Sequence, residues 1–355
     1  MMSAFKDRHC EERSDAATQS VTSRSGLLRC ARNDERGAAL LTVLLLVAVM
    51  AVVSAAAVER LTLATRLAGS AAGVEQARHF TLAAEALAMR RIESQLARSE
   101  GQVTADGDWI GKPFTLPLPG GTATMTVSDG GNCFNLNSLV AEATVGGNTV
   151  RPLAVEQFIG LMQALGVERG EADRIAAGAG DWIDADQVES PLGAEDASYA
   201  RGPTPYRSAN RAMVDAGELG AVAGVSPQLR QRMSPWVCAL PVNDLSPINV
   251  NTLLPEQAPL LQMLVPARLS PAQARAHLAA RPTGGYGSVN RFWSAPTLDG
   301  LVPSGDAASQ VKLTTRWFRL RTTVRLGDVA LASESLIDAG EPPLRVVRRK
   351  WGPEN

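Results

Sequence analysis

Residues 38–58 read AALLTVLLLVAVMAVVSAAAV, a run of 21 residues without a charged side chain. An α-helix rises about 1.5 Å per residue, so this run spans a hydrocarbon core of roughly 30 Å. Arg29, Arg32 and Arg36 precede the run. Because basic residues beside a span stay in the cytoplasm, the pattern predicts a single membrane pass with a cytoplasmic N-terminus and an exported C-terminal domain.

Three explanations compete for this run. A buried core helix needs a polar stripe, and the run offers only Thr42 and Ser54. A cleaved secretory signal has small residues available at 54–57, but its apolar region is usually about 7–15 residues long. The third explanation depends on Gly37-Ala38, because a charged leader that ends in Gly before a long apolar helix resembles a type IV prepilin.

The prepilin resemblance implies a specific processing step. The prepilin peptidase would cut after Gly37 and leave Ala38, methylated on its amine, as the first mature residue. Most pilins carry Glu at the fifth mature position, where this chain has Thr42. The departure either weakens the prepilin interpretation or indicates a minor pseudopilin that lacks this Glu. Residues 1–37 are then a leader, or partly sequence upstream of the true start codon.

The composition of the chain limits its function. The 355 residues are 45% hydrophobic and 20% charged, which is typical of globular proteins and excludes wholesale disorder. The net charge is −1, so no bulk basic excess indicates a nucleic-acid partner. Three histidines and 5% aromatic residues leave little material for a Ser-His-Asp triad or a sugar site. We therefore predict that the chain is not an enzyme.

Beyond the apolar run, the sequence predicts one continuous helix. Residues 61–96 contain no Pro and are rich in Ala, Leu, Glu, Gln and Arg. Phe80, Ala84, Leu87 and Ala88 fall on one stripe of such a helix. This stripe is expected to pack on another part of the chain.

Strand patterns occur in two separate places. Residues 122–127 form a short β-type segment that follows a predicted loop at 113–121. Residues 317–326 alternate apolar and polar side chains, 327–328 mark a hairpin, and 329–337 return as the partner strand. About 180 mostly helix-forming residues separate the two β regions. We therefore expect an α+β fold, in which a pilin-like transmembrane and stalk helix packs on a small antiparallel sheet with a large all-α domain inserted in the sheet.

The expected domain boundaries follow from these patterns. The parts are the leader 1–37, the transmembrane and stalk helix 38–100, the first sheet part 101–132, the inserted helical domain 133–310, and the second sheet part with a basic tail 311–355. Within the inserted domain, helical repeats are expected to start near residues 135 and 249.

The repeats share a short polar motif. Residues 133–142 (CFNLNSLVAE) and 247–256 (PINVNTLLPE) have the core Asn-(Leu/Val)-Asn-(Ser/Thr)-Leu in common. Short polar side chains ahead of an apolar helical run are typical N-caps. The alternative is a helix-hairpin-helix DNA-binding module, which holds a phosphate on the backbone amides of a Gly-rich turn. The two turns disfavour it, because 265–271 contains no Gly and Glu168 would repel a phosphate.

Two cysteines lie in the body of the chain. Cys133 and Cys238 are 105 positions apart and flank the first helical stretch. They either form one disulfide or remain buried free thiols. Export from the cytoplasm favours the disulfide.

Six carboxylates crowd into residues 181–196. The spacing departs from an EF-hand, because the sixth loop position is Glu instead of Gly. Without a cation these groups would repel one another, and Ca²⁺ suits such a set better than Mg²⁺. The alternative is a solvated acidic loop. The expected calcium ligands are Asp184, Asp186, Glu195 and Asp196 with the Val188 carbonyl, and Asp181 in reserve.

The ordered set of motifs resembles one family. Arg36-Gly37-Ala38, Thr42, the Asn135 motif, DWIDAD at 181–186 and INVNT at 248–252 together resemble the type II secretion system minor pseudopilin K, also called general secretion pathway protein K. The resemblance covers residues 36 to about 340.

The resemblance implies a role as well as a fold. It implies a pilin-like fold with an inserted, calcium-binding helical domain, and a complex with the minor pseudopilins I and J, and H, at the pseudopilus tip. The chain would cap that tip and help initiate assembly for protein export across the outer membrane. The prepilin peptidase and the inner-membrane assembly platform would be further partners. The alternative function is a membrane-anchored helix-hairpin-helix-like protein for DNA binding and uptake.

Overall fold

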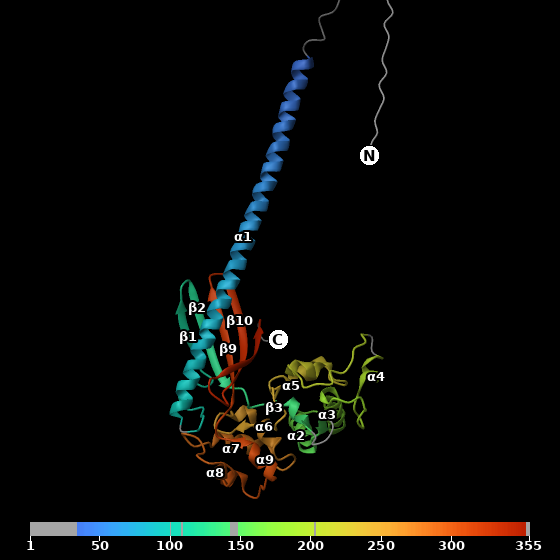
Figure 1. Ribbon diagram of the computed structural model, residues 1–355, viewed down its shortest axis with the longest axis vertical. Helices are drawn as coiled ribbons and strands as arrows, with labels where there is room; N and C mark the ends of the chain where they lie inside the picture. Colours follow the sequence, from blue (N-terminus) through green and yellow to red (C-terminus); the bar gives the residue numbers. More distant parts are fainter. Residues whose placement is uncertain (1–33, 100, 108, 143–147, 202–203, 353–355) are drawn as a thin grey trace, which may run out of the picture. The chain divides into compact units, whose positions relative to one another are not determined.

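The computed structural model describes residues 34–99, 101–107, 109–142, 148–201 and 204–352. Most of the expected leader, residues 1–33, therefore lies outside the described residues. The chain divides into two compact units, Met1–Ala68 and Gly69–Asn355, and every strand belongs to the second unit (Figure 1).

The long helix α1 runs from Asp34 to Arg98. It contains the one stretch of the described residues that is long and apolar enough to cross a membrane, and the side chains of that stretch are exposed. The Thr42 hydroxyl donates a hydrogen bond to the Ala39 carbonyl at 2.9 Å, inside the helix. The expected continuous apolar helix is confirmed.

The second unit contains a five-stranded antiparallel sheet in the order β1-β2-β9-β10-β11. Its strands are β1 Pro113–Leu118, β2 Gly121–Asp129, β9 Trp317–Leu326, β10 Val329–Asp338 and β11 Arg345–Trp351. The predicted hairpin between β9 and β10 is confirmed. The predicted loop at 113–121 is wrong, because its first half is β1. Pro is tolerated there because β1 is an edge strand.

The part of α1 after Gly69 packs on one face of this sheet. Ala77, Ala84, Ala88 and Ile92 are buried against apolar side chains of β2, β9 and β10. The predicted stripe is wrong at Leu87, which is 45% exposed. The true stripe passes through two polar residues that the hydrophobic pattern could not reveal.

Those polar residues are satisfied inside the packed face. Thr81 donates to the Ala77 carbonyl at 2.8 Å. Glu85 accepts from Arg349 Nε at 3.0 Å and from Ser335 Oγ at 2.5 Å. A buried carboxylate needs such partners, so this ion pair fixes the position of α1 against β10 and β11.

Residues 130–316, here called the helical segment, connect β2 to β9 although these two strands are neighbours in the sheet. Its helices are α2 Pro152–Ala164, α3 Arg169–Ile183, α4 Asp196–Tyr199, α5 Pro227–Met233, α6 Ala258–Gln262, α7 Pro271–Ala279, α8 Val289–Trp293 and α9 Gly305–Gln310. Its short strands are β3 Phe134–Asn135, β4 Val140–Glu142, β5 Asn148–Val150, β6 Val237–Cys238, β7 Ile248–Asn249 and β8 Val311–Lys312. The expected all-α composition is therefore not confirmed.

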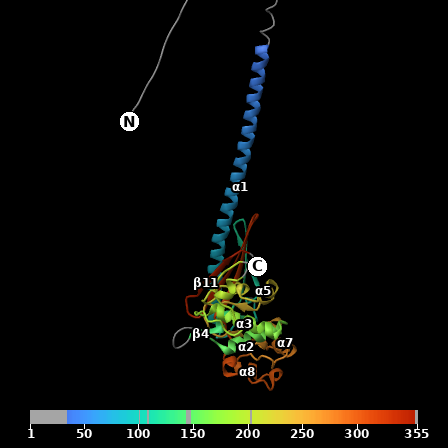
Figure 2. The same cartoon turned by 90° about the vertical axis from the view of Figure 1, so that its right-hand side faces the viewer.

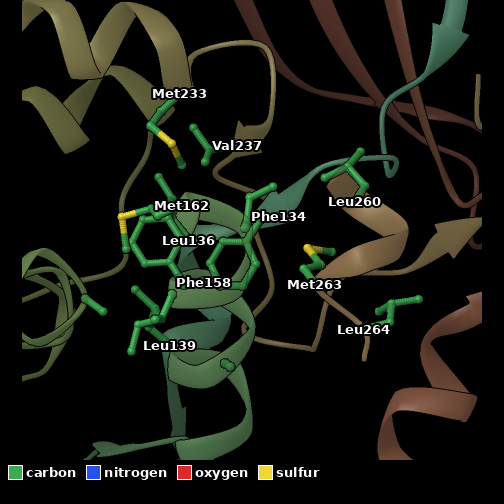
Figure 3. Packing of buried hydrophobic residues seen from close by; sticks show 14 of the residues in the cluster. Phe134, Leu136, Leu139, Phe158, Met162, Met233, Val237, Leu260, Met263 and Leu264 are labelled. Carbon is green, nitrogen blue, oxygen red and sulfur yellow. The ribbon is translucent and has the colours of Figure 1, made fainter. Parts of the chain in front are cut away.

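A separate apolar core holds the helical segment together (Figure 3). Phe134 and Phe158 stack with ring centroids 4.8 Å apart. Burying one such ring stabilises the fold by about 1.5–3 kcal/mol. Leu260 and Met263, from α6 and its C-terminal end, belong to the same core, so the two repeats share one interior.

The two asparagine motifs start with extended backbone instead of helix. β3 pairs in parallel with β6, and β7 pairs in parallel with β8. In the first motif Asn135 also caps a 3-10 turn by accepting from the Asn137 N–H at 3.3 Å. The expected N-cap is therefore present at Asn135, as the cap of a single turn.

The second asparagine of each motif fixes a distant loop. Asn137 Oδ1 accepts from the Met213 N–H at 2.7 Å, and Asn251 Oδ1 accepts from the Tyr286 N–H at 2.8 Å. Both asparagines are buried. These long-range bonds give the repeated motif a tertiary role that its local sequence does not reveal.

Cys133 and Cys238 form a disulfide, with their Cα atoms 5.8 Å apart. Cys133 directly precedes β3 and Cys238 ends β6. The bond therefore joins two residues that are 105 positions apart, and it lies beside the parallel pair of β3 and β6.

Candidate metal centre

The carboxylate cluster lies where α3 ends. Asp181 belongs to the last turn of α3, and Asp184 follows the helix in an extended conformation. The loop then returns to Glu195, which precedes α4. Asp184, Asp186 and Glu195 each contribute one carboxylate oxygen, and these three oxygens lie within 4.8 Å of one another. Asp184 and Glu195 are buried, and Asp186 is exposed.

Four oxygens near this loop are buried and lack a hydrogen-bond partner among the described residues. They are Asp181 Oδ1, Asp184 Oδ1, Glu195 Oε1 and Asn210 Oδ1. Leaving a buried polar atom unsatisfied costs about 1–3 kcal/mol, and more if it is charged. Oxygen-only donors of this kind match the coordination preference of Ca²⁺. The residues present therefore fit a calcium ion.

The same crowding changes the acidity of the carboxyl groups. Burial raises the pKa of Asp184 to about 7, with further contributions from Asp186, Asp181 and Glu195. Burial also raises the pKa of Asp181 and of Glu195. A cation would offset the repulsion that makes the ionised forms unfavourable.

The expected ligand Asp196 has other partners. Its Oδ1 accepts from the Ser208 N–H and hydroxyl, both at 2.9 Å, and Arg207 Nε lies 3.9 Å from Oδ2. The Ser208 hydroxyl is the main reason that the pKa of Asp196 is lowered. The Val188 side chain is 74% exposed, and the Val188 N–H donates to Asp186 Oδ1 at 2.8 Å. These contacts do not bring Asp196 or Val188 into the group of three carboxylates.

Asp181, kept in reserve by the sequence analysis, is part of the cluster. Its Oδ2 accepts from the backbone N–H groups of Ser190 at 3.1 Å and Ala194 at 2.9 Å, while Oδ1 has no partner. Gly193 makes this approach possible, because a Cβ at that position would overlap Asp181 Oδ2. Gly193 therefore shapes the site through its missing side chain.

Sequence reasoning missed Asn210. Its backbone is left-handed, with φ 47°, a conformation for which Asn is enriched. Its Nδ2 donates to the Asp186 carbonyl at 3.0 Å and leaves Oδ1 unpartnered. No spacing rule links a single Asn to the acidic loop that precedes it, so only the fold identifies this residue.

Three aromatic rings next to the cluster in the chain pack against one another. Trp182 meets Tyr199 at 5.4 Å and Tyr206 at 6.2 Å, measured between ring centroids. Trp182 follows Asp181 directly in α3. The indole is therefore placed to report on ordering of the acidic loop.

The remaining predicted sites give different outcomes. Gly37 and Ala38 lie inside α1, and cleavage between them stays a prediction. At the start of α3, Glu168 accepts from the N–H groups of Gly170 at 2.8 Å and Glu171 at 3.2 Å. This carboxylate takes the place that a phosphate would need, so the helix-hairpin-helix alternative is not favoured.

Comparisons with known proteins agree on one family. Residues 132–242 and 248–316 match family models described as type II secretion system (T2SS), protein K. A protein of Pectobacterium carotovorum subsp. carotovorum named type II secretion system protein K is 35% identical over 325 residues, covering 90% of this chain and 98% of that protein. The protein of the same name from Aeromonas hydrophila is 33% identical, with coverages of 88% and 96%.

A solved structure is also similar. One chain in the crystal structure of the GspK-GspI-GspJ complex from the enterotoxigenic Escherichia coli type 2 secretion system matches with a TM-score of 0.70 and 32% identity. The match covers 80% of this chain and 99% of that chain. The chain therefore belongs to the protein K family of the type II secretion system, a family of structural minor pseudopilins.

Proposed function

We propose that this chain caps the tip of a periplasmic pseudopilus and helps to initiate its assembly for protein export across the outer membrane. The observation that carries the proposal is the similarity to a chain solved with GspI and GspJ, over 99% of that chain. The helical segment is the second support. It lies beyond the end of the sheet at which α1 ends (Figure 1). A bulky domain there would block further stacking of subunits.

Thr42 fits a tip position. A carboxylate at the fifth mature residue would be expected to engage the terminal amine of a neighbouring subunit. Thr42 has no charge, and its hydroxyl is bonded within its own helix at 2.9 Å. A tip subunit has no neighbour on one side and does not need the carboxylate.

The proposed partners are the minor pseudopilins I and J, with H joining below them. The test is co-purification of the full chain from detergent-solubilised membranes that also contain tagged I and J. We expect a stoichiometric complex of the three proteins. Purification of I and J without this chain, at equal expression, would contradict the proposal.

We also propose that the prepilin peptidase cuts between Gly37 and Ala38 and that the amine of Ala38 is then methylated. The uncut helix would cross the inner membrane once, with its N-terminus cytoplasmic, and the assembly platform would take up the cut form. Mass spectrometry of the membrane protein should find Ala38 at the N-terminus. Gly37→Val should block cleavage, and Gly69→Val in the same helix is the matched control. An N-terminus near Val58 would mean an ordinary signal peptidase and would contradict the proposal.

Calcium is the proposed structural cofactor. Asp184, Asp186 and Glu195 would hold the ion, and the unpartnered oxygens of Asp181 and Asn210 would add to the set. The ion would supply charge compensation for a loop that joins α3 to α4. Hydrogen exchange of the acidic loop, measured with saturating calcium and with chelator, tests this assignment.

A further inference from the structure

A cleft of about 710 Å³ is lined by residues of the helical segment, α5 included, and by residues of β9, β10 and β11. Figure 2 labels α5 and β11, two of the elements that supply this lining. This volume is within the range of about 300–1,000 Å³ that is typical of ligand pockets. Five cationic side chains line what we call the basic cleft: Arg230, Arg319, Arg321, Arg348 and Lys350. Its two lining carboxylates are Asp215 and Glu334.

The two carboxylates do not balance the five cations. Glu334 is shared, with its carboxylate oxygens 3.6 Å from Arg319 Nε and 3.2 Å from Arg321 Nε. Asp215 pairs with Lys350. Among the described residues that line the cleft, five cations therefore outnumber two carboxylates, a difference of three charges.

Arg348 is half-buried in this cleft and is held by carbonyl groups. Its Nη1 donates to the Val214 carbonyl at 2.6 Å and to the Ala239 carbonyl at 3.0 Å. Within the described part of the chain, no carboxylate lies within 4.0 Å of Arg348 or of Arg230. A desolvated guanidinium beside other cations is stabilised by an incoming anion that makes paired hydrogen bonds.

We propose that the basic cleft receives an acidic segment of a partner protein. The planar fork of each guanidinium matches a carboxylate in two-point geometry. The walls also contain the exposed residues Pro235 and Trp351, which suit an apolar side chain next to the acidic ones. A polyphosphate fits less well, because a continuous run of phosphates brings no apolar side chain to Pro235 and Trp351.

A second cleft shows that size alone does not create this surplus. It has a volume of about 660 Å³ and is lined by Arg151, Lys312 and Arg316 together with Asp244 and Asp306. Arg316 there is already paired with Asp338 outside the lining, through two hydrogen bonds of 2.6 Å. With Asp338 included, the three cations of this second cleft face three carboxylates among the described residues. Lys312 supplies a matched control for a cation removed from a cleft of similar size.

The test is fluorescence anisotropy of the full chain in detergent with a labelled peptide of eight residues that alternates Glu or Asp with Leu. The control peptide has Gln and Asn in place of the acids. We expect the acidic peptide to bind, with an affinity that falls as salt is raised. Arg230→Gln and Arg319→Gln should each weaken binding about tenfold, whereas Lys312→Gln should leave it unchanged.

Several results would overturn the proposal. These are equal binding of the two peptides, no binding of either, or an equal loss of affinity in Lys312→Gln. Displacement of the peptide by inorganic phosphate or by an oligonucleotide at equal charge concentration would assign the cleft to a different anion and would also overturn it. Arg348→Gln removes bonds to the backbone and risks misfolding, so Arg230→Gln, on an exposed position of α5, decides the outcome.

Discussion

Residues 132–242 and residues 248–316 form two halves of the helical segment, and each begins with an asparagine motif that pairs in parallel with a later strand. The unpartnered buried polar atoms of the two halves differ in kind. Among the described residues of the second half they are ring nitrogens of His277 and Trp293. Burial lowers the pKa of His277 to about 4, so that ring is neutral. In the first half they include carboxylate oxygens of Asp181, Asp184 and Glu195.

The difference distinguishes the second half, which supports the fold, from the first half, which also contains the candidate metal site. A neutral buried ring nitrogen without a partner costs far less than a buried carboxylate without one, so nothing in the unpartnered atoms of the second half calls for a cation. In the first half, the proposed calcium ion would offset the buried carboxylates of the acidic loop. The duplicated motif therefore builds the framework, and the loop between α3 and α4 adds the candidate cation site.

The largest expected difference between the halves comes from the disulfide, which closes the first half. Replacing Cys133 and Cys238 by Ser removes a cross-link with a sequence separation of 105. In the chain-entropy model the loss is about 4–5 kcal/mol, as an upper figure. Denaturant unfolding followed by Trp fluorescence should show a lower midpoint. An unchanged midpoint would mean that the cross-link does not stabilise this half.

The two second asparagines provide a matched pair of substitutions. Asn137 makes three hydrogen bonds to the backbone of Met213 and Leu240, whereas Asn251 makes one at 2.8 Å and a weak one to Gln102 at 3.5 Å. Asn137→Ala should destabilise the chain by about 3 kcal/mol and Asn251→Ala by about half of that. Thermal melts of both variants compare them directly. A larger cost at Asn251 would contradict the assigned hydrogen bonds.

A glycine substitution tests the shape of the acidic loop. Gly193→Ala places a methyl group against Asp181 Oδ2, so we expect a loss of about 2 kcal/mol together with a weaker response to calcium. Gly305→Ala in the second half is the control, because a Cβ at Gly305 meets nothing within 4 Å. Both variants should be melted with calcium and with chelator. Equal behaviour of the two variants would remove Gly193 from the site.

A smaller effect is expected from pH when calcium is removed. The pKa of Asp184 is raised from 3.8 to about 7, so the folded chain binds more protons than the unfolded chain between about pH 4 and 7. In chelator the free energy of unfolding should therefore fall as the pH rises through this window. Asp184→Asn should flatten that part of the profile, measured by thermal melts at several pH values. A rise in stability with pH that depends on Asp184 would contradict the assigned pKa.

Sequence reasoning predicted the features that depend on local pattern. The apolar helix, the alternation of β9 and the β9–β10 hairpin follow from charge, period and turn residues. The strand β1 was missed because its prolines disguise an edge strand. The group of Asp184, Asp186 and Glu195 was predicted from charge density along one loop.

Features that depend on tertiary contacts were out of reach of the sequence. The place of Glu85 on the packed face of α1 is set by Arg349, 264 residues later. Asn210 joins the acidic loop because the chain returns to it after α4. The surplus charge of the basic cleft exists only where β11 meets the helical segment. Each case requires residues that are distant in sequence to meet in the fold.

Hydrogen exchange tests the central difference between the halves most directly. The full chain in detergent is compared with saturating calcium and with chelator, and exchange is read by mass spectrometry for each half. At a hundredfold excess over its Kd, calcium should stabilise the folded acidic loop by about 2.7 kcal/mol, so amides around 181–210 should exchange up to about a hundredfold more slowly. Residues 248–316 should exchange equally in both conditions. Identical exchange of residues 181–210 with calcium and with chelator would contradict the account.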